Sequence, residues 1–253
     1  MLMSLCFMIH PGRSWAQFLR ATDTRTFTPQ AVMAERKQWG ADLGFGGSFN
    51  RGNTDVNYLN TNFSVFAARD PATAYLSGSM SYNTFGKVRV LNQGTLAARY
   101  DHSIQGPWKV FVFNTNGYNE FNRLNYRTTM GIGPWYDYTL GPTQHGLSLA
   151  MTHEYEKFKG GILERAGRVS FRDVSRLPIS QVAELRADLF YVPKVEEVRD
   201  YHLFAEISLQ TMILRDRLGL KLSWTDEYDN RPKPGVKPND VLWLTSLTLH
   251  LGK

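Results

Sequence analysis

Apolar and polar residues alternate with a period of two along most of the chain after residue 38, and this pattern limits the fold more than any other feature. In the segment 201–210, one face carries mainly apolar residues, namely Tyr201, Leu203, Ala205, Ile207 and Leu209. Alternation of this kind predicts β-strands with one apolar face and one wet face. No apolar run reaches the roughly 18 residues of a transmembrane helix, so no such helix is predicted.

The alternating segments predict about twelve strands. They begin near Trp39, Val56, Thr73, Gln93, Trp108, Asn125, His145, Gly167, Val182, Tyr201, Leu218 and Val241. Every second connection is a tight turn, at Asp70-Pro71, Gly106-Pro107, Gly141-Pro142, Leu177-Pro178 and Arg215-Asp216-Arg217. Apart from the short segment 51–55, the intervening connections are predicted to be longer loops, at 83–92, 114–124, 156–167, 192–200 and 226–240. This layout is typical of an antiparallel up-and-down transmembrane β-barrel, predicted here for residues 39–253.

The N-terminal residues suit an exported chain. Met1 to Ile9 is a short apolar stretch, and the small residues Ser14 and Ala16 are typical of a signal-peptidase site. We therefore expect a cleaved signal peptide at 1–16 and a polar periplasmic lead-in at 17–38. Localisation in the bacterial outer membrane of a Gram-negative cell follows from the combination of export and barrel.

Charge and cysteine content narrow the functional classes. The net charge is +6, but lysine and arginine are spread among acidic residues, so nucleic-acid binding is not expected. The single cysteine, Cys6, allows no intrachain disulfide and no multi-cysteine zinc site. The six histidines show no metal-ligand spacing. We expect neither a metal nor a cofactor.

Charged residues on the wet faces are the candidates for lining the lumen, namely Arg99, Asp101, Glu154, Glu184, Arg186, Asp188, Glu206 and Lys221. At membrane depth such charges must face water or one another. Barrels of about eight strands are filled by side chains, and those of about sixteen or more hold open channels, so twelve falls between. The charges either line a narrow pore for ions or small solutes, or pair with one another and close it.

Aromatic residues fall near the ends of the predicted strands, as in the girdles of membrane barrels. Near the tight turns these are Trp39, Tyr100 and Trp108. Near the longer loops they are Tyr155, Tyr201, Trp224 and Trp243.

The sequence poorly matches two catalytic arrangements that occur in membrane-barrel hydrolases. A barrel phospholipase needs His and Ser two residues apart on an outward face, whereas His145 and Ser148 are three apart and fall on opposite faces. Asp200 and His202 have the spacing of one half of an omptin-like protease site, but the required Asp-x-Asp partner is missing. We therefore do not expect an enzyme.

Two segments carry a family resemblance: residues 48–63, with Gly52-Asn53-Thr54, and residues 226–253, with Tyr228-Asp229-Asn230, Pro232 and Pro234. Both resemble the salt-stress-induced outer-membrane protein family, also called YdiY-like, which has no assigned biochemical activity. The resemblance implies an exported barrel and a link to salt or osmotic stress. The chain departs from the family at its end, Leu251-Gly252-Lys253, where members commonly carry an aromatic residue.

Together these observations predict an outer-membrane barrel, either a narrow porin-like channel or a closed structural or binding barrel. The alternative from another class is a soluble periplasmic β-sandwich or lipocalin-like binder. The expected partners are outer-membrane lipid, the outer-membrane assembly machinery during biogenesis, and ions or small solutes.

Overall fold

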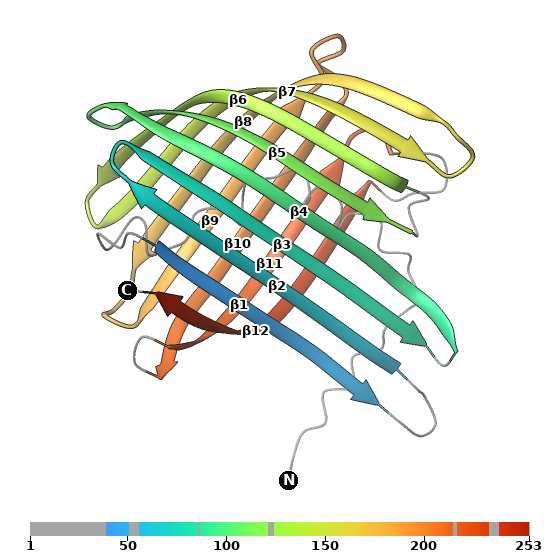
Figure 1. The fold of residues 1–253 in the computed structure, drawn as a ribbon, viewed down its shortest axis with the longest axis horizontal. Coiled ribbons are helices and arrows are strands. Elements are labelled where there is room, and N and C mark those ends of the chain that lie inside the picture. The colour runs from blue at the N-terminus through green and yellow to red at the C-terminus, as the bar shows by residue number, and fades with distance from the viewer. Residues whose placement is uncertain are drawn as a thin grey trace.

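The computed structural model describes residues 39–50, 56–85, 87–120, 124–214, 217–232 and 238–252. These residues form one closed antiparallel sheet of twelve strands, with no helix among them (Figure 1). The strands are β1 (Trp39–Asn50), β2 (Val56–Arg69), β3 (Ala72–Phe85), β4 (Val88–Gln105), β5 (Trp108–Asn119), β6 (Leu124–Leu140), β7 (Thr143–Phe158), β8 (Leu163–Pro178), β9 (Ala183–Pro193), β10 (Tyr201–Leu214), β11 (Leu218–Asp229) and β12 (Asn239–Gly252). The predicted twelve-stranded barrel is confirmed. A two-sheet sandwich and a lipocalin-like barrel of about eight strands are both excluded.

Pairing between the first and last strands closes the barrel. Strand β1 pairs with β2 on one side and with β12 on the other, from Gly40–Gly252 to Phe45–Leu247. Figure 1 shows β12 beside β1, with every other strand next to its neighbours in sequence. Because the strand number is even, β1 begins and β12 ends at the same end of the barrel. That end also holds the connections after β2, β4, β6, β8 and β10, and we call it the turn end; the opposite end is the loop end.

The structure has the predicted tight turns, but several of the predicted loops are shorter than expected. Gly106 and Gly141 have φ angles of 56° and 58°, which glycine adopts without strain, and they form the predicted turns. The long loops predicted at 83–92, 114–124 and 156–167 are wrong in extent. Strands β3 to β8 continue into these segments, because backbone pairing persists there although the apolar alternation has faded.

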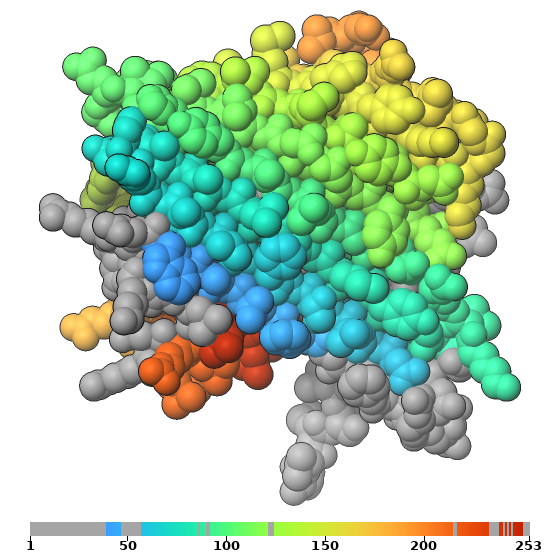
Figure 2. Space-filling model, viewed as in Figure 1, coloured from blue at the N-terminus to red at the C-terminus, as the bar shows by residue number. Residues whose placement is uncertain are grey.

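Successive residues of each strand point alternately into the barrel and out of it. On β7, Met151 is 68% exposed while Glu154 is 7% exposed. The same contrast holds around the sheet, with large apolar side chains exposed on the outer rows and polar or charged ones buried on the inner rows. Figure 2 shows the outer surface of β1 to β7 from the direction of Figure 1. Within the described residues there is also no helix that is long and apolar enough to cross a membrane.

Several inner glycines are covered by an aromatic ring from the neighbouring strand. A Cβ placed on Gly146 would lie 2.1 Å from Trp135, and one on Gly131 would lie 2.3 Å from Phe113. Phe66 covers Gly40 in the same way. The absence of a side chain at these positions lets the ring lie flat against the wall, which fills the inner surface of a strongly curved sheet.

The charged lumen wall as candidate functional site

The structure places all eight predicted lumen residues on inward-facing rows of the sheet. Five are buried, namely Arg99, Asp101, Glu154, Glu184 and Asp188. The other three, Arg186, Glu206 and Lys221, are half-buried. Side chains alternate between the two faces of the sheet along each of these segments without a bulge. The inward direction of these residues therefore follows from the period of two.

Ion pairs between neighbouring strands neutralise most of these charges. The guanidinium of Arg172 donates to both carboxylate oxygens of Asp188, at 3.0 and 2.8 Å. Lys221 donates to Glu206 at 2.7 Å. Arg99 forms an ion pair with Asp101 on its own strand. Such pairing is required, because a buried charge without a partner is strongly destabilising.

A second group of charges lies towards the loop end. Arg127 forms an ion pair with Glu156 and lies 3.8 Å from Glu154. Arg168 lies 3.8 Å from Glu154 and donates to Asp200 at 3.1 Å. Glu154 therefore lies between two arginines from the strands on either side of it. This chain of contacts joins β6, β7, β8 and the start of β10 around the inner wall.

Aromatic rings and guanidinium groups share one part of the lumen. The guanidinium carbon of Arg99 lies 4.2 Å from the ring centre of Phe111 and 5.0 Å from that of Trp135. On the other side, the guanidinium of Arg172 lies 5.7 Å from Trp135 and 4.7 Å from Phe190. We call these five residues the arginine–aromatic belt. Cation–π contacts of this kind are stronger when they are removed from water.

The belt is densely filled. The side chains of Arg172 and Arg99 are only 1% and 3% exposed. The Trp135 indole N–H donates to Asp137 at 2.6 Å, which fixes the ring that both arginines contact. Lys109 lies 2.6 Å from the same Asp137 carboxylate. The belt therefore forms a layer of buried, mutually contacting side chains on the inner side of strands β4 to β9.

Another part of the wall is neutral. In their loop-end halves, strands β2 to β4 present amide and hydroxyl groups to the lumen, joined by hydrogen bonds from Asn60 to Ser81 at 2.7 Å and between Ser79 and Thr95 at 2.8 Å. The lumen thus has one region of charges and rings and a neighbouring region of small hydrogen-bonding groups. Such a surface holds water and polar solutes better than apolar ones.

Acidic groups outnumber basic groups at the loop-end mouth of the described lumen. Glu154, Glu156, Asp200, Glu227 and Asp229 lie there with Arg127, Arg168 and Lys194, whose backbone pairs with that of Arg168. His202 adds a ring whose Nδ1 lies 3.6 Å from Asp229. An excess of carboxylates attracts cations to a pore mouth.

One carboxylate of the loop end lies just after the end of β5. Asn92 donates to Glu120 at 2.9 Å and Arg89 donates to it at 2.8 Å. The hydrogen bond from Asn92, with the nearby positive charge of Arg89, holds the pKa of Glu120 below its usual range. These contacts tie the start of β4 to the end of β5.

The residues considered for hydrolysis have other partners. Asp200 contacts Arg168, and His202 faces Asp229. His145 lies on the outer face and Ser148 on the inner face, as their spacing predicted. Among the described residues, no group of three or more His, Cys, Asp or Glu side chains is placed to hold a metal ion.

The predicted girdle residues all lie on outward rows, in two groups. At the turn end, Trp39, Tyr100 and Trp108 are each about half exposed, and Trp108 packs on Tyr136 with ring centres 4.7 Å apart. Towards the loop end lie Tyr155, Tyr201, Trp224 and Trp243; the rings of the two tryptophans are 6.5 Å apart.

The structure describes only some of the residues that carry the family resemblance. Tyr228 and Asp229 end β11, and Asn230 follows, donating to the backbone carbonyl of Arg199. Pro232 lies in the connection to β12. Gly52, Asn53, Thr54 and Pro234 lie outside the described residues, as do the expected signal peptide at 1–16 and the lead-in at 17–38.

Several residues of the charged lumen wall were missed from the sequence. They are Arg127, Trp135, Glu156, Arg168, Arg172 and Arg176, the last of which forms an ion pair with Glu184. The alternation of β6 and β7 already places Arg127 and Glu156 on the wet face, so this signal was available. Arg172 lies in the strand whose alternation is weakest, and its partner on β9 follows only from the register.

Comparison with known proteins identifies the family. Residues 43–250 match the family described as protein of unknown function, DUF481, and the chain belongs to that family. No curated protein matches it.

Solved membrane barrels resemble the structure at low sequence identity. The NanC porin is 13% identical, with a TM-score of 0.48, and the alignment covers 84% of this chain and 98% of that one. The translocator domain of the autotransporter NalP from Neisseria meningitidis is 12% identical, with a TM-score of 0.48 and coverages of 94% and 97%. The KdgM porin is 7% identical, with a TM-score of 0.43 and coverages of 84% and 96%.

Proposed function

We propose that this protein is an outer-membrane β-barrel whose lumen is a narrow, water-filled passage for ions or small polar solutes, constricted at the arginine–aromatic belt. The observation that carries the proposal is the reversal of polarity across a single sheet. Outward rows are apolar and exposed, whereas inward rows carry charges, amides and hydroxyls, with aromatic rings packed among them. A closed sheet of this kind satisfies its backbone groups internally and meets lipid only with apolar side chains.

The acidic excess at the loop-end mouth supports a preference for cations. With the tight turns on the periplasmic side, the loop end faces the cell exterior and its carboxylates concentrate cations at the entrance. Neutralising Asp229 by Asp229→Asn removes one of these charges without altering the belt. Glu120→Gln is the matched control. Glu120 also lies at the loop end, but it comes directly after the inward-facing Asn119 and so continues the outward row, where it contacts Asn92.

Single-channel recording of the purified protein, folded in detergent and inserted into a planar lipid bilayer, tests the proposal. Discrete conductance steps are expected, with a reversal potential in a salt gradient that indicates cation preference. Asp229→Asn should reduce this preference and Glu120→Gln should leave it unchanged. A protein that shows the heat-dependent gel shift of a folded barrel but never conducts would contradict the channel.

A closed structural barrel is the second candidate, and the near-complete burial of Arg172 and Arg99 favours it. This candidate predicts that the protein folds and inserts into the bilayer but does not conduct ions. By resemblance to the salt-stress-induced family, we also propose a role under salt or osmotic stress in either case. A deletion strain that grows like its parent at high salt would contradict that role.

A further inference from the structure

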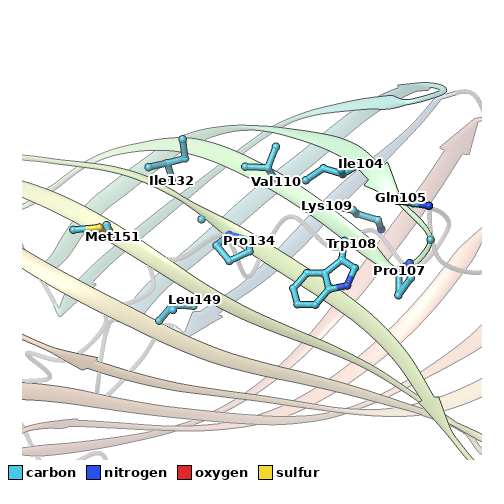
Figure 3. Close-up of a pocket in the computed structure, with 12 residues that line it drawn as sticks. Ile104, Gln105, Pro107, Trp108, Lys109, Val110, Ile132, Pro134, Leu149 and Met151 are labelled. Carbon is cyan, nitrogen blue, oxygen red and sulfur yellow. The ribbon is translucent and has the colours of Figure 1, made fainter.

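The outer wall of the barrel carries two open, shallow hollows along β4 to β11. One hollow of about 830 Å³ is bordered by Trp108, Pro134 and Leu149, with Pro134 between the other two in Figure 3. A neighbouring hollow of about 990 Å³ shares these three residues and continues as far as Leu203 and Tyr228. We call the two hollows together the outer groove.

A local break in the sheet contributes to the groove. The pairing of β6 with β7 runs to Ile132–Met151 and resumes in the same register at Trp135–Ser148, so Gly133 and Pro134 lie unpaired with β7. Pro134 has no N–H to donate to the ladder. Its ring lies on the outward row instead and forms part of the floor of the groove.

Most of the lining is apolar and belongs to outward rows. Beyond the shared residues it includes Phe171, Leu189, Leu203 and Ala205. Ala205 leaves space between larger neighbours, which lets an extended hydrocarbon chain lie against the wall. Burying such a chain is favourable in proportion to the apolar area covered.

One outward carboxylate in the groove lies among polar neighbours. Asp173 lines the groove, and its side chain is 38% exposed. Its Oδ1 lies 3.9 Å from Nδ1 of His145 and has no hydrogen-bond partner among the described residues, because the Ser175 hydroxyl lies 2.9 Å from the same nitrogen. The His145 ring stacks on Tyr138, with ring centres 4.6 Å apart. This group places a carboxylate with unused hydrogen-bonding capacity on an otherwise apolar wall.

Asp173 lies near the aromatic girdle of the turn end. Asp173 and Tyr136 both pair with Leu147 in the ladder, so only one strand separates them. Tyr136 in turn packs on Trp108. Amphipathic rings of this kind lie at the level of lipid headgroups. The carboxylate is therefore placed where a headgroup meets the barrel.

We propose that the outer groove binds a phospholipid whose headgroup carries a primary ammonium group. The ammonium donates to Asp173, and an acyl chain lies along the apolar lining towards Leu203. Charge complementarity selects this occupant, because a headgroup without a cation would leave its phosphate near an uncompensated carboxylate. The proposal rests on the membrane placement in the proposed function and is independent of conduction.

Native mass spectrometry of the detergent-folded barrel tests this directly. The probes are phosphatidylethanolamine, phosphatidylcholine and phosphatidylglycerol with identical acyl chains. The ethanolamine lipid should bind about tenfold more tightly than the glycerol lipid, as expected for one charge-assisted hydrogen bond. Phosphatidylcholine, whose ammonium has no N–H, should bind more weakly than the ethanolamine lipid.

Two variants separate the site from general lipid adhesion. Asp173→Asn should abolish the preference for the ethanolamine lipid. Asp226→Asn is the matched control, because Asp226 is an outward carboxylate at the far end of the same groove and should leave the preference intact. Equal binding of all three lipids by the unaltered protein, or an unchanged preference in Asp173→Asn, would overturn the proposal. The heat-dependent gel shift, run on each variant, distinguishes these results from a failure of the barrel itself.

Discussion

Arg172 and Asp188 form a two-pronged ion pair across the β8–β9 ladder, with N–H···O distances of 3.0 and 2.8 Å. The two side chains are 1% and 5% exposed, so neither charge has water to replace its partner. Arg172 also contacts Trp135 and Phe190 through its guanidinium face. The pair therefore links the ionic contacts of the lumen to its aromatic belt.

Breaking this pair from one side should destabilise the barrel strongly. Arg172→Ala leaves the Asp188 carboxylate buried, which costs about 3–5 kcal/mol in the free energy of unfolding. The measurement is urea unfolding of the protein in lipid vesicles. Arg89→Ala, which removes an exposed ion pair to Glu120, should cost less than about 1 kcal/mol. Equal effects of the two substitutions would contradict the assigned role of the buried pair.

Replacing both members with apolar residues should be much less harmful than replacing one. Arg172→Met together with Asp188→Leu removes both charges of the pair at once, so neither is left buried without the other. Arg186 loses only its longer contact to Asp188, at 3.9 Å. We expect most of the lost stability to return in the double variant, measured by the same unfolding. A double variant as unstable as Arg172→Ala would show that packing around the guanidinium, rather than charge pairing, dominates.

The ring over Gly146 should make that position intolerant of any side chain. A Cβ there would lie 2.1 Å from Trp135, so Gly146→Ala must displace the indole at a cost of about 1–3 kcal/mol. Gly46 is a matched control on an inward row of β1, where the nearest atom to an added Cβ is 4.0 Å away. Gly46→Ala should change the unfolding free energy by less than about 1 kcal/mol. Similar losses at both glycines would contradict the packing described.

Glu120 should titrate below an ordinary glutamate. Its pKa is lowered by the hydrogen bond from Asn92 and by Arg89, so the favourable contact is present above the unfolded pKa and is lost as pH falls through the folded pKa. Carboxyl carbon shifts in an NMR titration measure this value. Asn92→Ala should move the pKa of Glu120 upward. No change on that substitution would exclude the Asn92 hydrogen bond as the main cause.

The strands were predictable because a barrel wall with an apolar outer face and a polar lumen face must alternate. Tyr201, Leu218 and Trp108 are the first residues of their strands, as the sequence predicted. The ends at 85–88 and 158–163 were not predictable in the same way. Beyond the apolar band both faces are polar, so backbone pairing continues without any sign in the sequence.

Which side chains pair inside the lumen depends on the register between neighbouring strands. The apolar–polar periodicity of one strand does not give this register. The inward direction of Asp188 followed from the sequence of β9, but Arg172 as its partner required the pairing of β8 with β9. The outward group of His145, Asp173 and Ser175 was missed for the same reason, since it joins two strands. Spacing along a single strand does not bring His145 and Ser175 together, because they lie opposite each other on β7 and β8.

A spin-label scan of β10 tests most directly whether one face of this sheet meets lipid while the other does not. Ile207, Ser208, Leu209 and Gln210 are each replaced by labelled cysteine in a Cys6→Ser background, and the protein is folded into lipid vesicles. Accessibility to oxygen dissolved in the bilayer should be high at 207 and 209 and low at 208 and 210. Uniform accessibility, or high values at 208 and 210, would contradict the membrane-spanning barrel.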